Sequence, residues 1–139
     1  MDRLLIAQKL ETLRQCLTRV AGKCPPDATT LAGDIDLQDI LVLNLTRSVQ
    51  LCVDIASHII AASSEAAPAS IDEAFSTLAR IGVIDDTTAT NLRRAVGFRN
   101  IAVNNYDSVD WDIVHAICQS QLDDFRAFAS KIGTLLDEP

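Results

Sequence analysis

The sequence predicts an all-α protein, an antiparallel bundle of four to five helices that forms a single domain over residues 1–139. Apolar residues recur at steps of three and four along most of the chain, as on the buried face of a helix. Hydrophobic residues make up 48% of the chain and aromatic residues only 4%, so the core consists mainly of Leu, Ile, Val and Ala. A chain of 139 residues is long enough for one such core and too short for two ordinary domains.

The first helix is predicted from Leu4 to about Val20, because Gly22 and the prolines at 25 and 26 end the pattern. Residues 27–33 are expected to form a loop. The apolar face of this helix consists of Ile6, Leu10, Leu13 and Leu17.

Asp34 or Asp36 is expected to cap the second helix, which continues to Ile60. It is the longest apolar pattern in the chain and is therefore predicted to be the central helix. Residues 61–69 are expected to form a loop. The inward positions of the helix are Ile40, Leu41, Leu45, Val49, Cys52, Val53, Ala56, Ile59 and Ile60.

Ser70 and Glu73 have the spacing of a capping box, which predicts a short helix from there to about Arg80, ended by Gly82. The next helix begins at Asp85 or Asp86, and its expected buried side chains are Ala89, Leu92, Ala95, Val96 and Ile101. Asp110 caps a final helix with apolar residues at Trp111, Ile113, Val114, Ile117, Cys118, Leu122, Phe125, Phe128, Ile132 and Leu135.

Several classes of protein are disfavoured. No apolar run approaches the ~20 residues that cross a bilayer, and the N-terminus lacks the apolar region of a signal peptide. We therefore expect a cytoplasmic protein that does not enter a membrane. Cys16, Cys24, Cys52 and Cys118 lack the close pairing of zinc ligands, so we expect reduced thiols, no metal and no cofactor.

The stretch 97–106, Gly-Phe-Arg-Asn-Ile-Ala-Val-Asn-Asn-Tyr, carries the most chemical information. Arg99 offers five donors in a fixed fork, which suits a phosphate group. Asn104 follows five residues later, and five helical steps separate two side chains by about 140°. The two converge only if the helix ends between them, as the turn-forming residues from Asn105 to Ser108 favour.

This stretch resembles the Arg-Asn-x-x-x-His-x-Tyr signature of the HepT family of HEPN-domain toxins, with Arg99, Asn100 and Tyr106 matching and Asn104 at the histidine position. Residues 44–60 resemble the long central helix of that family, and residues 75–84 resemble its connecting helix and turn. The resemblance extends from about Leu4 to Leu136 and implies an HEPN-like bundle.

The resemblance also implies a function. HepT toxins are metal-independent ribonucleases that form homodimers, with two motifs facing one cleft, and are the partners of MNT-type nucleotidyltransferase antitoxins. Arg99 and the residue at 104 are then catalytic, and Tyr106 is the site to which the antitoxin adds AMP. The alternative for Tyr106 is a ring that merely packs over the helix end.

Asparagine does not exchange a proton at useful pH, so Asn104 is expected to cost ~10²–10⁴ in rate if position 104 holds the general acid or base. The substitution is either engineered, to allow production of a toxic nuclease, or a natural departure that accompanies another role. The chain is then an impaired nuclease, or alternatively a non-catalytic helical partner of a nucleotidyltransferase, or a purely structural dimer.

Three further residues are candidates for supporting roles. Asp54 and His58 are four residues apart and could pair on one helix face near the cleft, although a half-buried structural histidine is an equal alternative. Asn100 could hold Arg99, or simply lie on the surface. A net charge of −7 means that RNA needs a local basic patch, for which the candidates are Arg80, Arg93, Arg94 and Arg99.

Overall fold

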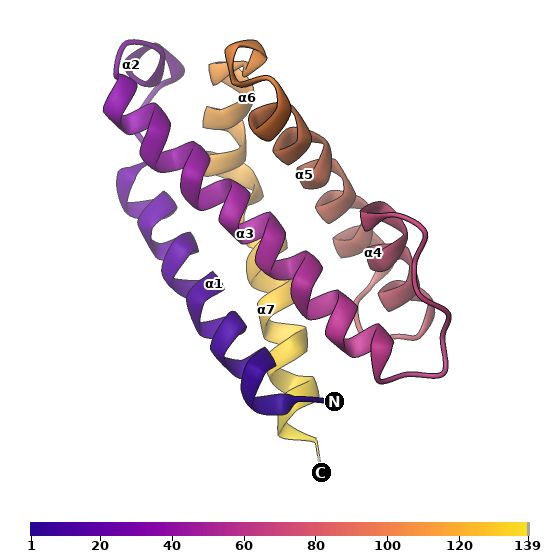
Figure 1. Cartoon of the computed structure of the whole chain (residues 1–139). Helices are drawn as coiled ribbons and strands as arrows, with labels where there is room; N and C mark the ends of the chain where they lie inside the picture. Colours follow the sequence, from indigo (N-terminus) through magenta and orange to yellow (C-terminus); the bar gives the residue numbers. More distant parts are fainter. Residues whose placement is uncertain (139) are drawn as a thin grey trace.

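The computed structural model describes residues 1–138, in which every regular element is a helix and there is no strand. Four long helices form the bundle (Figure 1), which confirms the predicted fold class. They are α1 (Arg3–Lys23), α3 (Ile35–Ala61), α5 (Asp86–Asn104) and α7 (Leu122–Asp137). The shorter elements are α2 (Ala28–Ala32), α4 (Ile71–Arg80), η1 (Tyr106–Ser108), α6 (Trp111–Ala116) and η2 (Ile117–Gln121).

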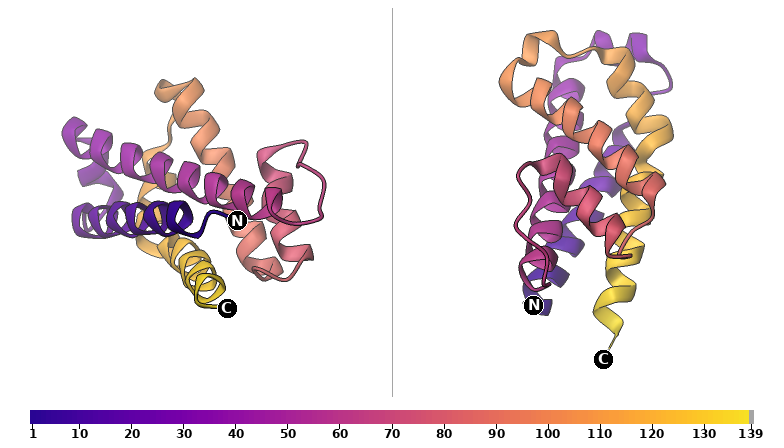
Figure 2. Two further views of the ribbon diagram at one scale, coloured as in Figure 1. Left: turned by 60° about the horizontal axis from the view of Figure 1, so that its bottom comes forward. Right: turned by 90° about the vertical axis from the view of Figure 1, so that its right-hand side faces the viewer.

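Helix α3 is the central helix, as the sequence predicts, because it packs against α1, α4, α5 and α7. Helix α4 lies across the side of the bundle against α5 (Figure 2). The apolar faces meet in one continuous core, where the rings of Phe75 and Phe128 pack edge to face with centroids 6.2 Å apart. Both termini lie at the same end of the bundle, and the end of α5 lies at the other (Figure 1).

The helix starts follow the predicted capping residues. Asp34 and not Asp36 caps α3, and Asp85 and not Asp86 caps α5, each by accepting a hydrogen bond from the backbone N–H three residues later. Ser70 accepts in the same way from Glu73, but the Glu73 carboxylate binds the N–H of Ala69 at 2.8 Å and not that of Ser70. Helix α4 therefore has a capping box displaced by one residue.

Gly82 ends α4 with a φ of 84°, a left-handed conformation that other residues adopt at a cost. The N–H of Val83 reaches back to the carbonyl of Leu78, and the N–H of Gly82 to that of Ala79. These two bonds form the six-to-one and five-to-two pattern that satisfies the last carbonyls of a helix. The prediction that Gly82 ends this helix is confirmed.

Four features of the fold outside the motif differ from the prediction. Helix α1 continues through Gly22 to Lys23. Residues 28–32 form the short helix α2, which begins at the Asp27 cap and is supported at its other end by Gln38, whose side-chain N–H donates to the carbonyls of Leu31 and Ala32. The final helix is not α-helical throughout, because residues 117–121 form a π-helical segment between α6 and α7. Ile101 is 49% exposed and lies outside the core.

Helix α3 is long and apolar enough to cross a membrane by length and composition alone. However, 56% of its most apolar window is buried against the other helices, as in the core helix of a bundle. The buried face of α3 also carries three polar side chains, each hydrogen-bonded to a backbone carbonyl of a helix: Gln38, Asn44 and Ser48.

Candidate functional site

The motif residues lie at the C-terminal end of α5, and this helix does not end where the sequence predicts. Helix α5 includes both Arg99 and Asn104, and its last turn closes with the Asn105 N–H donating to the carbonyl of Ile101 at 2.8 Å. Arg99 and Asn104 therefore remain on one regular helix, about 140° apart around its axis. They do not converge within one chain, and the expected ending between them is wrong.

Arg99 is instead fixed by a neighbouring helix. Its Nη2 group donates to Oε1 of Gln50 on α3 at 2.8 Å, and its Nη1 group donates to Oδ1 of Asn100 at 3.2 Å. Gln50 Nε2 in turn donates to Oδ1 of Asp54 at 2.8 Å, while Oδ2 of Asp54 pairs with Nζ of Lys9 on α1 at 3.4 Å. This polar chain, Arg99–Gln50–Asp54–Lys9, joins three helices and restricts where the guanidinium can point.

The expected pair of Asp54 and His58 does not form. Both oxygens of Asp54 are engaged by Gln50 and Lys9, the latter a full positive charge from another helix. His58 is half-buried in the last turn of α3, and none of the residues 1–138 forms a side-chain hydrogen bond with it. Asp54 thus belongs to the arginine site and His58 does not.

Asn100 and Asn104 lie four residues apart on an exposed face of α5. Asn100 holds the Arg99 guanidinium from the side, as expected. In the part of the chain that the structure describes, no side chain is hydrogen-bonded to that of Asn104. Its carboxamide is therefore open to solvent and to a second molecule.

Tyr106 lies in η1, directly after α5, and its hydroxyl donates to Oδ1 of Asp39 on α3 at 2.8 Å. Its ring packs edge-on against Trp111, with centroids 6.0 Å apart. Desolvation, the hydrogen bond to Asp39 and the negative charge of that carboxylate together raise the pKa of Tyr106 to about 12. The side chain is still 39% exposed, so a partner protein can reach it.

Gln50 and Asp39, which bond directly to Arg99 and Tyr106, are not among the site residues predicted from the sequence. The spacing of Gln50 and Asp54 on one helix face is a signal that could have indicated the first. Asp39 carries no local signal, because it meets Tyr106 across 67 residues of sequence.

The expected basic patch is dispersed. Arg80 pairs with Glu65 at 2.8 Å, and Arg93 donates to the Ser76 hydroxyl at 3.3 Å. Arg94 lines a groove between α5 and α6, together with Phe98. Only Arg99 is connected to the polar chain described above.

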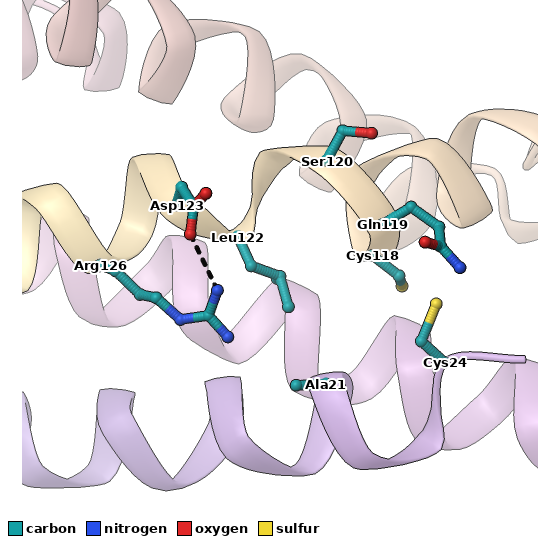
Figure 3. Close-up of a pocket in the computed structure, with 8 residues that line it drawn as sticks. All are labelled: Ala21, Cys24, Cys118, Gln119, Ser120, Leu122, Asp123 and Arg126. Atoms are coloured by element: carbon teal, nitrogen blue, oxygen red, sulfur yellow. Dashed lines mark hydrogen bonds and ion pairs between the residues drawn. The ribbon is translucent and has the colours of Figure 1, made fainter.

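A separate pocket of roughly 290 Å³ lies between the end of α1 and η2, and Figure 3 shows Cys24 and Cys118 pointing toward each other inside it. Arg126 is also in this pocket, but it pairs with Asp123 at 2.9 Å. No motif residue lines it. All four cysteines are free thiols, and residues 1–138 contain no cluster of three or more potential metal ligands.

Comparison with known proteins relates this geometry to a family. The family model described as ribonuclease HepT-like matches residues 8–132. The mRNA nuclease HepT of Shewanella oneidensis is 35% identical over 128 residues, which cover 92% of this chain and 96% of that protein.

Solved structures give the same result. The tri-AMPylated HEPN toxin of Shewanella oneidensis in complex with its MNT antitoxin matches with a TM-score of 0.87 and 34% identity, over 96% of this chain and 98% of that one. A toxin–antitoxin complex with AMP-PNP matches with a TM-score of 0.85 and 34% identity, over 95% and 98%. The cytosolic protein YutE of Bacillus subtilis, at 16% identity and a TM-score of 0.86 over 99% and 92%, shares the fold. Together with the Arg99, Asn100 and Tyr106 motif, these matches show that the chain belongs to the HepT-like family.

Proposed function

We propose that this chain is the toxin of a HEPN/MNT toxin–antitoxin pair, an RNA endonuclease that needs no metal and is weakened by Asn104. The observation that supports this best is the fixed guanidinium of Arg99, held by Gln50 at 2.8 Å and by Asn100 at 3.2 Å beside an open face of α5. Two of its five N–H groups are used in these bonds, which leaves three for a phosphate. We expect the protein to act in the cytoplasm, which contains both RNA and the ATP needed for AMP addition.

The proposed reaction is attack of a ribose 2′-hydroxyl on the adjacent phosphate, which becomes a 2′,3′-cyclic phosphate as its bond to the 5′-oxygen of the next nucleotide breaks and that oxygen takes up a proton. Arg99 stabilises the negative charge that develops on the phosphoryl oxygens. Asp54 acts through Gln50 to position Arg99. A group at residue 104 that exchanges protons would accept or supply one during the reaction, and histidine is suited to this near neutral pH. An asparagine at 104 can form hydrogen bonds but cannot exchange a proton, so the rate of RNA cleavage is expected to be lower by ~10²–10⁴ than with histidine.

A homodimer follows from the geometry of this proposal. Because Arg99 and residue 104 point about 140° apart on one helix, a phosphate would meet both only if a second copy supplied one of them. Leu43 on α3 is 50% exposed, and Val103, on the Arg99 face of α5, is 59% exposed. Leu43 is two turns before Gln50 on the same face of α3, and Val103 is one turn after Arg99 on α5, so both would be covered in such a dimer.

We further propose that the partner is an MNT-type nucleotidyltransferase and that it adds AMP to Tyr106. The related Shewanella toxin is tri-AMPylated in its complex with MNT antitoxin. Phosphate charge added at Tyr106 would repel RNA from the neighbouring motif. The exposed fraction of Tyr106, 39%, is compatible with access by an enzyme.

The test is to restore histidine. The natural chain, Asn104→His and the double variant Arg99→Ala/Asn104→His would be produced with the antitoxin, separated from it, and assayed on total RNA in EDTA. We expect strong cleavage by Asn104→His alone. Cleavage by the double variant at the same rate would contradict the role of Arg99.

The alternative function is a non-catalytic helical partner that supports a nucleotidyltransferase. Asn104 itself favours this alternative, because asparagine stands in place of histidine, the only residue of the family motif that titrates near neutral pH. If Asn104→His cuts no RNA but the chain still binds and activates the nucleotidyltransferase, this alternative holds.

A further inference from the structure

A tyrosine that only receives AMP needs to be accessible, whereas Tyr106 is also held in a defined contact with Asp39. The carboxylate of Asp39 lies 2.8 Å from the phenolic oxygen, and the Trp111 ring packs edge-on against the Tyr106 ring with centroids 6.0 Å apart. Asp39 lies in the second turn of α3, whose start is anchored by the Asp34 cap. A helix and a ring thus hold a carboxylate against the one hydroxyl that the proposed function modifies.

We propose that Asp39 is the general base for transfer of AMP to Tyr106, so that the toxin supplies a catalytic residue for its own modification. This inference rests on the proposed function. As the Tyr106 oxygen bonds to the α-phosphorus of ATP held by the antitoxin, the bond from that phosphorus to the bridging oxygen breaks and pyrophosphate leaves with the electron pair. The phenolic proton passes to Asp39 and then to water.

The phenolic proton of Tyr106 moves to Asp39 only while the new bond to phosphorus forms. In the resting protein the phenol stays neutral, since its pKa is raised to about 12 by desolvation and by Asp39. The phenolic proton becomes strongly acidic only as the oxygen bonds to phosphorus. A carboxylate that already accepts a hydrogen bond from this proton then takes it up without rearrangement. General-base assistance of this kind is typically worth ~10²–10⁴ in rate.

Two further carboxylates lie close to the pair along the chain. Asp36 lies one turn before Asp39 on α3, and Asp107 follows Tyr106 in η1. Both are exposed, and neither forms a hydrogen bond with Tyr106 in the described structure. Asp36→Asn is therefore a matched control, since it removes the same charge from the same helix without touching the phenol.

The contact itself is checked first. Tyr106 is the only tyrosine in the chain, so the absorbance of the phenolate reports its titration directly. We expect a pKa of about 12 in the natural chain and in Asp36→Asn, and a lower one in Asp39→Asn, which loses the carboxylate charge. An unchanged pKa in Asp39→Asn would overturn the contact and the inference with it.

The decisive experiment measures the rate of the first AMP addition by mass spectrometry, with the cognate nucleotidyltransferase, Mg²⁺ and ATP. We expect Asp39→Asn to lower the turnover rate by ~10²-fold or more without raising the KM for the toxin, Asp39→Glu to recover part of it, and Asp36→Asn to match the natural chain. Equal rates for Asp39→Asn and the natural chain would overturn the inference, as would a defect confined to KM, which would indicate docking.

The proposed function is tested separately by the same assay. Labelling of the natural chain but not of Tyr106→Phe supports modification at Tyr106, whatever Asp39→Asn does. If the natural chain is not labelled, or Tyr106→Phe is labelled equally, the proposed modification is wrong and the role of Asp39 is wrong with it.

Discussion

Gln50 is the residue on which the arginine site depends. It accepts from Arg99 and donates to Asp54 through the two ends of one carboxamide, so it transmits the position of the Asp54–Lys9 pair to the guanidinium. Without it, Arg99 would keep only the contact with Asn100, its neighbour in sequence.

In the Asn104→His background, we expect Gln50→Leu to lower RNA cleavage by up to ~10²-fold, because a small displacement of a positioned charge costs about that much. Weaker cleavage with unchanged thermal stability would indicate a positioning role. Leu51→Ala, a change at the half-buried neighbour on α3, serves as a control for general effects on that helix. Full activity of Gln50→Leu would contradict the role.

Asn44 is the other residue with an unusual environment. It is buried in α3, its Nδ2 group donates to the carbonyl of Ile40 at 2.8 Å, and its Oδ1 atom has no hydrogen-bond partner among the described residues. Such an acceptor costs about 1–3 kcal/mol of stability. We expect Asn44→Leu to raise the free energy of unfolding by on the order of 1 kcal/mol and Asn44→Asp to lower it, as measured by urea denaturation. A loss of stability in Asn44→Leu would contradict this account.

At the scale of elements, the helix starts could be predicted because caps are local. Each of four cap residues accepts a hydrogen bond from a backbone N–H two or three residues later, namely Asp34, Ser70, Asp85 and Asp110. The short helix α2 could not be predicted in this way, since its end depends on Gln38 of the following helix. The π-helical segment at 117–121 has no simple sequence signal either, because its residues continue the helical spacing of their neighbours.

The cap of α5 predicts a pH dependence. The Thr88 N–H lowers the pKa of Asp85 from its ordinary 3.8, so Asp85 contributes stability above the unfolded-state pKa and loses it as the pH falls through the lower folded-state pKa. We expect Asp85→Asn, which keeps the cap acceptor but does not titrate, to show a flatter loss of stability below about pH 4 in thermal melts. Asp86→Asn, next to the cap, should keep the steep loss. Equal slopes in both variants would contradict the assignment.

The whole molecule shows what long-range contacts add. The apolar spacing predicted the bundle and its central helix, and the motif indicated Arg99, Asn100 and Tyr106. Their partners Gln50 and Asp39 lie 49 and 67 residues away in sequence, so only the packing of α3 against α5 and η1 reveals them. The regular helix through Asn104 was also unforeseen, because turn-forming residues at 105–108 allow a helix to end either before or after that position.

That regular helix leads to the prediction for the whole assembly. If the cleavage site combines Arg99 of one protomer with residue 104 of its partner, then the natural chain and Arg99→Ala/Asn104→His, each inactive or weak alone, should cut RNA once mixed and allowed to exchange subunits. The mixed dimer contains one site with both an arginine and a histidine. No gain on mixing, while Asn104→His alone is active, would mean that each protomer works by itself.

The proposed dimer surface is tested by sedimentation. Val103 is 59% exposed on the Arg99 face of α5, whereas Ile113 on α6 is 54% exposed beside the separate groove lined by Phe98 and Ile101. We expect Val103→Asp to give monomers and to abolish the cleavage gained on mixing, because a carboxylate buried in an apolar interface is not paired. Ile113→Asp should remain dimeric. The reverse pattern would place the interface over α6, away from Arg99, and the proposed site shared between two chains would then be wrong.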